Sequence, residues 1–216
     1  MLLSFERRFL FVANTKTAST SIETVLRPHA TIVRAETPRR KHVGLSVALE
    51  EYRGDFARAG VSPGGVLKFG VMRDPIDWIT SWYRYRRGNA VESPLPADMD
   101  FAAFWTRADW NIKSPKGVPY LQRRLFCEGE TTLADVIIPY PRLSETFARI
   151  CKGLGIAVGD LPQENRSRLR ETEGLSPELR EEMRDFYAAD YALWDRLDEI
   201  NAPALARLEE GDYAPR

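Results

Sequence analysis

The sequence predicts an α/β fold, with a mainly parallel central sheet flanked by helices, in a single domain that spans residues 1–216. Two continuous apolar runs, residues 9–13 and 66–72, are typical of strands buried on both faces. A polar loop and then a helix-like segment follow each run. Strands that alternate with helices favour a parallel sheet, and such sheets bind ligands beyond the carboxyl ends of their strands.

The first strand–loop–helix unit comprises residues 9–26. Its strand reads Phe-Leu-Phe-Val-Ala, and Ile22, Val25 and Leu26 recur at helical spacing after the loop. The helix of the second unit has a clear start signal, because Asp74 follows the strand as an N-cap and Pro75 occupies the first helical position.

The other elements are less regular, and a helix that begins at Ser176 and Pro177 is expected to be the last long one. The further elements expected are, in chain order, a strand at residues 31–33, a helix from Gly44, a turn at 60–65, a loop at 89–99, a short helix capped by Asp100, a last strand at 135–138, a helix capped by Ser144 and closed by Gly155, a polar and basic loop at 161–172, and a peripheral tail beyond Asn201.

The composition argues against several classes of function. Lys plus Arg and Asp plus Glu each number 31, so bulk charge gives no basis for binding nucleic acid or membranes. Residues 9–13 are too short for a membrane span, and the charges at residues 6–8 interrupt any signal-peptide core. The cysteines, Cys127 and Cys151, match no metal-ligand spacing and are expected to be reduced thiols of a cytoplasmic protein without a metal site.

The loop at residues 14–21 has the composition of an anion-binding site. It joins a buried strand to a helix, where free N–H groups and the helix dipole favour an anion. Lys16 adds a mobile positive charge, and the Thr and Ser residues add hydroxyl donors. The loop contains no glycine and is therefore not a Walker A motif. The alternative interpretation is a Ser/Thr-rich helix cap.

A second candidate anion-binding group follows the strand at 66–72. Arg73 stands at the strand end, where its planar fork can bind a phosphate. Ser81 lies about two helical turns further on, so it reaches the same ligand only if the helix runs alongside that ligand. The alternative is an exposed arginine and an ordinary helical serine.

Both loops resemble motifs of one enzyme family, and weaker similarity extends over most of the chain. The sequence Lys-Thr-Ala-Ser-Thr-Ser at residues 16–21 resembles the 5′-phosphosulfate loop of carbohydrate sulfotransferases, in the form found in the heparan sulfate 2-O-sulfotransferase group. Arg73, Pro75 and Ser81 resemble the 3′-phosphate motif of this family. The weaker matches are Lys41-His42, Asn165-Arg166-Ser167, Tyr187, Asp190 and Tyr191.

This resemblance implies a P-loop nucleotide-kinase-like fold and a sulfotransferase activity. The enzyme would transfer a sulfonate group from 3′-phosphoadenosine-5′-phosphosulfate (PAPS) to an acceptor hydroxyl of a carbohydrate or small glycoconjugate. The donor-binding residues that it implies are Lys16, Thr17, Ala18, Ser19, Thr20 and Ser21 for the 5′ group, Arg73 and Ser81 for the 3′-phosphate, and Arg166 and Arg168 in a loop that covers the nucleotide.

Two residues are assigned to the chemical step. Lys16 stabilises the leaving 5′-phosphate together with backbone amides, so no metal is required. His42 is the general base, because its ordinary pKa suits proton removal near neutral pH. Glu36 is the reserve base, and the alternative for His42 is a cap on the helix that follows.

Two rival functions stay open. One is a non-catalytic nucleotide-binding relative, and the other is an ATP-dependent small-molecule kinase, against which the absence of a Walker motif counts. The short chain without a membrane anchor favours a cytoplasmic, bacterial enzyme. The acceptor cannot be identified from the irregular middle of the sequence.

Overall fold

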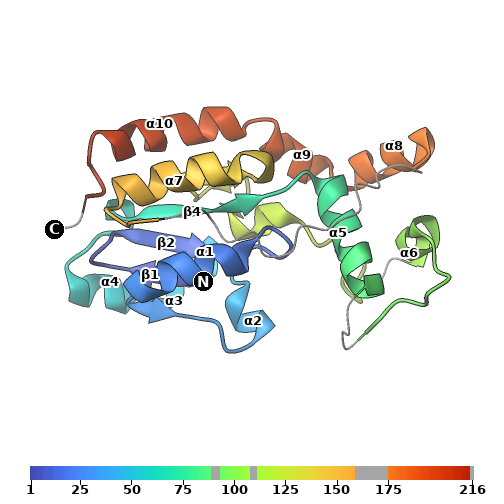
Figure 1. Ribbon diagram of the computed structural model, residues 1–216, viewed down its shortest axis with the longest axis horizontal. Coiled ribbons are helices and arrows are strands. Elements are labelled where there is room, and N and C mark those ends of the chain that lie inside the picture. The colour runs from blue at the N-terminus through green and yellow to red at the C-terminus, as the bar shows by residue number, and fades with distance from the viewer. Residues whose placement is uncertain (89–92, 108–110, 159–174, 215–216) are drawn as a thin grey trace.

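The computed structural model describes residues 1–88, 93–107, 111–158 and 175–214. Its centre is a five-stranded sheet in the order β3-β1-β2-β4-β7, and a separate ribbon joins β5 to β6 (Figure 1). The strands are β1 (Leu2–Ser4), β2 (Phe9–Val12), β3 (Ile32–Val33), β4 (Leu67–Met72), β5 (Cys127–Glu128), β6 (Thr131–Thr132) and β7 (Val136–Pro139).

Helices surround this sheet. They are α1 (Ser19–Leu26), α2 (Pro38–Lys41), α3 (Leu45–Glu51), α4 (Arg53–Ala59), α5 (Pro75–Gly88), α6 (Phe101–Arg107), α7 (Leu143–Gly153), α8 (Pro177–Phe186), α9 (Ala188–Trp194) and α10 (Leu197–Glu209). Short 3₁₀ turns lie at η1 (Arg27–His29), η2 (Pro63–Gly65), η3 (Gln122–Leu125) and η4 (Tyr140–Arg142). The prediction of an α/β fold with helices around a central sheet is confirmed.

The sheet is mixed, so the prediction of a mainly parallel sheet was wrong. β2 and β4, and β4 and β7, pair in parallel. β1 pairs antiparallel with both β2 and β3. β1 was not predicted, because three residues are too few to show a pattern, yet Leu2 and Leu3 are fully buried in it.

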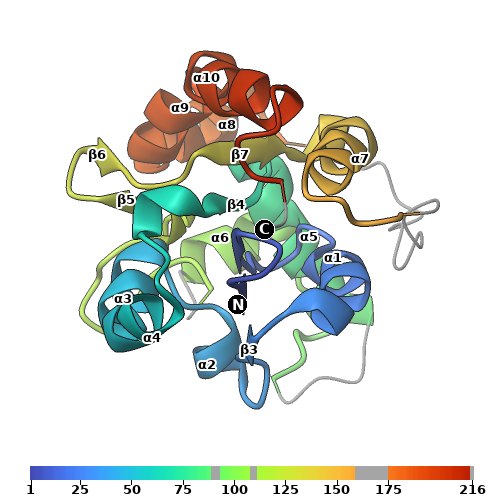
Figure 2. The same ribbon diagram turned by 90° about the vertical axis from the view of Figure 1, so that its left-hand side faces the viewer.

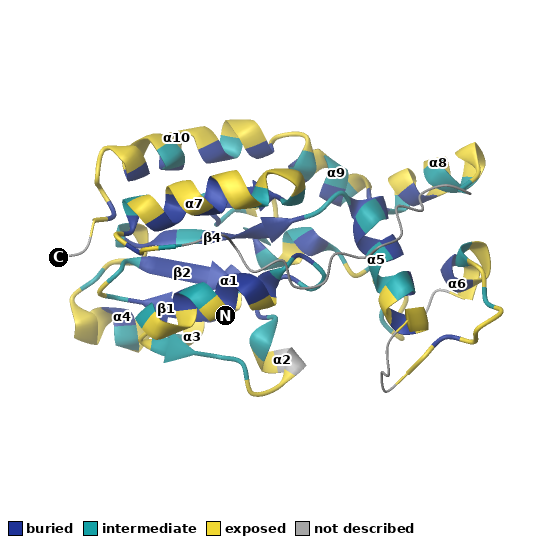
Figure 3. Cartoon of the chain, in the orientation of Figure 1, coloured by how far each residue is buried: buried dark blue, intermediate teal, exposed yellow. Residues whose placement is uncertain are grey.

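Both faces of the sheet are covered, which explains the continuous apolar runs. Phe9 and Phe11 of β2 pack in a cluster with residues of α1, α7 and α10. Leu10 and Val12 point to the other face and pack with residues of α3, α4 and α9. Figure 2 shows α1 and α7 on one side of the sheet and α3 and α4 on the other. In Figure 3, α7 and α10 turn their buried sides inward and their exposed sides to solvent.

A third, aromatic-rich cluster lies beyond the carboxyl ends of the parallel strands. It joins α5, α6 and α8 through side chains that include Trp78, Phe104 and Tyr187. Trp105 packs edge-on against Phe186, with ring centroids 5.1 Å apart. Trp105 is thereby part of the core, as the sequence favoured.

Most helix starts agree with the sequence. The carboxylate of Asp74 accepts hydrogen bonds from the N–H groups of Ile76 and Asp77, at 2.9 and 3.0 Å, and so caps α5. Asp100 caps α6 in the same manner. Ser144 is not a cap, because α7 begins one residue earlier and Arg142 is its N-cap residue.

The carboxyl-terminal part differs most from the prediction. The expected single long helix is divided into α8 and α9 at Tyr187, whose φ and ψ of −98° and 19° are not helical. The prediction of a peripheral tail beyond Asn201 was also wrong. Asn201 hydrogen-bonds both backbone groups of Ile137, and Leu208 and Tyr213 are buried in the core. No helix in the described part of the chain is long and apolar enough to cross a membrane.

Candidate functional site

The candidate site lies where the three parallel strands end. Val12 of β2 is paired with Gly70 of β4, and Met72 of β4 is paired with Pro139 of β7. The residues that follow these strands therefore meet at one edge of the sheet, and α5 lies beyond this edge (Figure 1). The two predicted anion-binding loops are among them.

The loop after β2 is tight although it contains no glycine. Lys16 and Ala18 adopt left-handed backbone conformations, with φ of 57° and 56°, which are uncommon for residues with side chains. Two hydrogen bonds hold the loop: Trp78 Nε1 donates to Thr15 O at 2.9 Å, and Thr17 Oγ1 donates to Asn14 O at 3.1 Å. The strained backbone is therefore fixed by its surroundings.

The start of α1 leaves its first N–H groups available. Ala18 is the N-cap residue, and no side chain among the described residues caps this end. The alternative of a Ser/Thr-rich helix cap is therefore not realised. The N–H of Ile22 makes the first bond back to the loop, to Ala18 O at 3.3 Å, so the N–H groups of residues 19–21 precede it. Such groups bind anions at helix N-termini.

The hydroxyl groups of this loop differ in their surroundings. Thr20 is exposed, whereas Thr17, Ser19 and Ser21 are buried. The Oγ of Ser21 has no hydrogen-bond partner in the described structure. It is thus the buried hydroxyl of the loop whose hydrogen-bonding capacity is left unused.

Lys16 lies against the aromatic side of α5. Its Nζ is 3.3 Å from the ring centroid of Tyr85 and 5.4 Å from that of Trp82. Burial, and secondarily the positive charge of Arg73, lower the Lys16 pKa to about 8. Two cations that disfavour each other's charge are suited to bind an anion between them, because the anion relieves their repulsion.

Arg73 stands at the end of β4, as predicted. Its guanidinium lies over the ring of Tyr140, 4.9 Å from the centroid, and its buried Nε has no hydrogen-bond partner among the described residues. The backbone of Arg73 is held by Gln122, which accepts from the Arg73 N–H at 3.1 Å and donates to the Arg73 carbonyl at 2.8 Å. The backbone is fixed, and part of the guanidinium is left unused.

Ser81 lies on the side of α5 that faces the first loop. Its neighbours at helical spacing, Trp78 and Tyr85, contact Thr15 and Lys16. Ser81 is half-buried, and no hydrogen bond joins it to Arg73 in the described structure. The structure therefore places Ser81 beside the loop but does not show it sharing a contact with Arg73.

His42 contacts the chain just before the first loop. Its Nδ1 is 2.7 Å from Ala13 O. A carbonyl only accepts, so Nδ1 carries the hydrogen and the neutral ring presents a free lone pair on Nε2. Burial lowers the His42 pKa, which favours the neutral form that a base requires. The helix-cap alternative is not realised, because Gly44 is the N-cap residue of α3 and no side chain caps it.

The residues around His42 are less suited to catalysis. Glu36 is exposed, and its carboxylate is 3.9 Å from the guanidinium of Arg40. Its pKa is lowered, mainly by a hydrogen bond to its own backbone N–H, so it is a weak base. The Nζ of Lys41 is 2.8 Å from the buried carboxylate of Glu23 in α1 and is thus already paired.

Sequence reasoning missed the residue that joins the two loops. Gln122 in η3 is buried, and its Oε1 accepts from Asn14 Nδ2 at 2.8 Å as well as from the Arg73 N–H. The buried carboxylate of Asp190 in α9 accepts from the N–H groups of Gln122 and Arg123, at 2.9 and 2.8 Å. Burial raises the Asp190 pKa to about 6. A glutamine in an irregular segment gives no sequence signal for such a contact.

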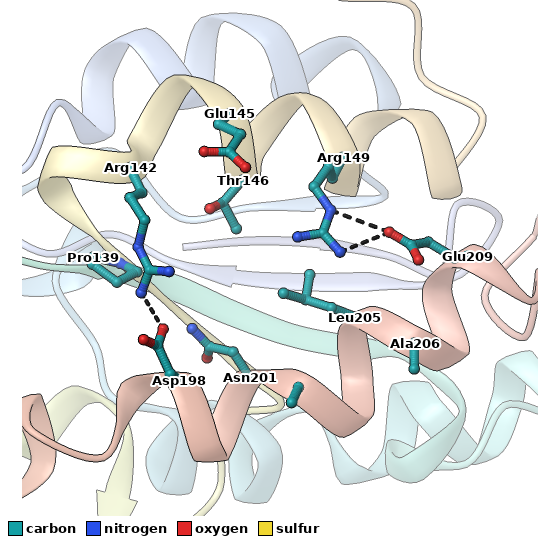
Figure 4. Close-up of a pocket in the computed structure, with 11 residues that line it drawn as sticks. Pro139, Arg142, Glu145, Thr146, Arg149, Asp198, Asn201, Leu205, Ala206 and Glu209 are labelled. Atoms are coloured by element: carbon teal, nitrogen blue, oxygen red, sulfur yellow. Dashed lines mark hydrogen bonds and ion pairs between the residues drawn. The ribbon is translucent and has the colours of Figure 1, made fainter.

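The remaining features of the site region are quickly located. Arg166 and Arg168 lie outside the described residues. A groove of about 310 Å³ lies between α7 and α10, and none of the predicted site residues lines it (Figure 4). Its opposite charges are paired across it, Arg142 with Asp198 and Arg149 with Glu209. No group of three or more His, Cys, Asp or Glu side chains in the described ranges is arranged to hold a metal ion.

Comparison with protein-family models, with curated proteins and with solved structures found no match for this chain. The function must therefore be inferred from the chemistry of the site and from the resemblance of its two loops.

Proposed function

We propose that this chain is a sulfotransferase that transfers the sulfonate group of PAPS to an acceptor hydroxyl, of a carbohydrate or small glycoconjugate. The observation that carries the proposal is the juxtaposition of two anion-binding groups at the ends of adjacent parallel strands. The first is the loop at residues 14–21, with its available N–H groups, and the second is Arg73, with its unpartnered Nε. A nucleotide with phosphates on both its 3′ and 5′ positions fits two such groups.

The proposed chemistry uses Lys16 and His42 in separate roles. The acceptor oxygen forms a bond to sulfur while the bond between sulfur and the 5′-phosphate oxygen breaks, and adenosine 3′,5′-bisphosphate leaves with the electron pair. The acceptor proton passes to His42 Nε2, whose lone pair is free because Nδ1 is bound to Ala13 O. Lys16 and the first N–H groups of α1 meet the negative charge that develops on the leaving phosphate.

Arg73 gives this site its preference for the donor. Its guanidinium would bind the 3′-phosphate, which PAPS carries and ATP lacks. Ser81 would contribute from α5, and Arg166 and Arg168 would cover the nucleotide. Both cysteines in the chain are free thiols, which agrees with the cytoplasmic location expected from the sequence.

Thermal unfolding with two nucleotides tests this assignment. Adenosine 3′,5′-bisphosphate at 100 times its Kd should add about 2.7 kcal/mol to the free energy of unfolding, because it binds only the folded state. For a chain of this length, that corresponds to an increase in Tm of roughly 5–10 °C. ATP at the same concentration should raise Tm much less. Equal increases with both nucleotides would contradict the assignment of Arg73 to a 3′-phosphate and would favour the kinase alternative.

A further inference from the structure

The side chain of Gln122 joins the ends of β2 and β4. Its Oε1 accepts from Asn14 Nδ2 at 2.8 Å and from the Arg73 N–H at 3.1 Å, and its Nε2 donates to Arg73 O at 2.8 Å. Asn14 in turn donates to Val71 O at 3.0 Å. One buried amide thus holds the first residue of each loop.

Gln122 is itself fixed from outside the sheet. Asp190 accepts the N–H groups of Gln122 and Arg123, so α9 holds the backbone of η3. The other side of η3 meets the chain after His42, since a Cβ on Gly44 would lie 2.6 Å from Arg124 O. Only glycine allows this close approach. The amide of Gln122 therefore starts from a backbone that cannot easily move.

The contacts to Arg73 are made to its backbone and not to its guanidinium. Gln122 consequently sets where the Arg73 side chain begins without using its hydrogen-bonding capacity. Because Oε1 is shared between Asn14 and Arg73, a shift of one loop disturbs the bond to the other.

We propose that Gln122 is a positioning residue that sets the distance between the two phosphate-binding loops. This role rests on the proposed function, since it presumes that one ligand contacts both loops. A ligand with two phosphates gains affinity from sites held at the correct separation, because little ordering is left to be done on binding. A ligand with one phosphate needs only one loop and gains little from that separation.

The test compares two ligands on two matched variants. Gln122→Met removes the amide and keeps the side-chain length. Asn201→Leu is the control, because Asn201 is another buried amide that hydrogen-bonds both backbone groups of one strand residue, Ile137, at 2.7 and 2.9 Å. Calorimetry on the folded proteins would give the Kd of adenosine 3′,5′-bisphosphate and of adenosine 5′-monophosphate.

The expected result is a selective loss in one variant. In Gln122→Met, the preference for the bisphosphate over the monophosphate should fall about tenfold or more relative to the unaltered protein. In Asn201→Leu, the preference should stay within about twofold, even if Tm drops similarly. If Gln122→Met does not fold, Gln122→Glu serves the same purpose, since it keeps the acceptor and replaces the donor to Arg73 O by an oxygen.

Two other outcomes would overturn the role of Gln122. An equal loss of affinity for both ligands would mean that the residue only supports the fold. If the unaltered protein binds neither ligand, the proposed function is wrong and the positioning role is lost with it. If the unaltered protein prefers the bisphosphate and Gln122→Met keeps that preference, the positioning role alone is wrong.

Discussion

Replacement of His42 by alanine is expected to lower the rate of sulfonate transfer by about 10²–10⁴-fold, the usual contribution of a positioned base. The variant should still fold and bind adenosine 3′,5′-bisphosphate, because its backbone contacts to the loop are unchanged and the lost contact is one hydrogen bond to Ala13 O. Steady-state kinetics and calorimetry on the same preparation measure both quantities.

The pH dependence gives this prediction a second readout. The rate of the unaltered protein should fall as the pH drops through the His42 pKa, which burial places below its ordinary value of about 6.5. His42→Ala should lack this acidic limb. Stability should follow the same sign: below pH of about 6.5 the unfolded chain binds more protons than the folded one, so the folded state loses stability as the pH falls.

Two variants serve as controls for the base. His29→Ala replaces the other histidine, which lies in η1 beyond the far end of α1, and should change neither the rate nor its pH profile. Glu36→Gln should leave the rate within a few-fold of the unaltered protein, because Glu36 is exposed and paired with Arg40. Normal activity in His42→Ala would move the base elsewhere, with Glu36 the first residue to test.

Substitution of the two site cations should separate binding from chemistry. Arg73→Ala should weaken donor binding about 10–100-fold, since a charge-assisted hydrogen bond contributes about 1.5–3 kcal/mol. Lys16→Ala should lower turnover about 10²–10³-fold with a smaller effect on donor affinity, because Lys16 meets charge that grows in the transition state. Donor affinity by calorimetry and kcat for both variants give the comparison.

The control for these variants is an arginine outside the site. Arg149 pairs with Glu209 at 2.7 Å in the groove between α7 and α10 (Figure 4). Arg149→Ala should therefore change neither donor affinity nor turnover. A Lys16→Ala protein with normal turnover would remove this lysine from the mechanism, and an Arg73→Ala protein with normal affinity would remove the 3′-phosphate assignment.

The parts of the fold that the sequence predicted are those with a strong local signal. The apolar runs of β2 and β4 are continuous because both sheet faces are covered, and Asp74 with Pro75 is a local start signal that α5 uses as expected. β1 was missed because its three residues are too few to show a period. α10 was missed because Pro203 lies inside it and its buried residues are sparse, although Leu208 and Asn201 contact the core and β7.

The candidate site divides in the same manner. Lys16 and Arg73 could be predicted because they follow buried strands directly, and the order of those strands in the sheet brings them together. Gln122 and Asp190 could not be assigned their contacts, because they lie 49 and 117 residues after Arg73 and Gln122 belongs to no periodic segment. The contact of Lys16 with Tyr85 depends on the rotation of α5, which helical spacing alone does not give.

The most direct test of the proposed function is transfer of label from PAPS labelled in its sulfonate group. The protein would be incubated with this donor and a panel of hydroxyl-bearing acceptors: sugars, glycosides and small glycoconjugates. We expect label on at least one acceptor, with an equal amount of adenosine 3′,5′-bisphosphate released, and loss of both in Lys16→Ala and His42→Ala. Tight binding of adenosine 3′,5′-bisphosphate with no label on any acceptor would contradict the enzyme and favour a non-catalytic nucleotide-binding protein.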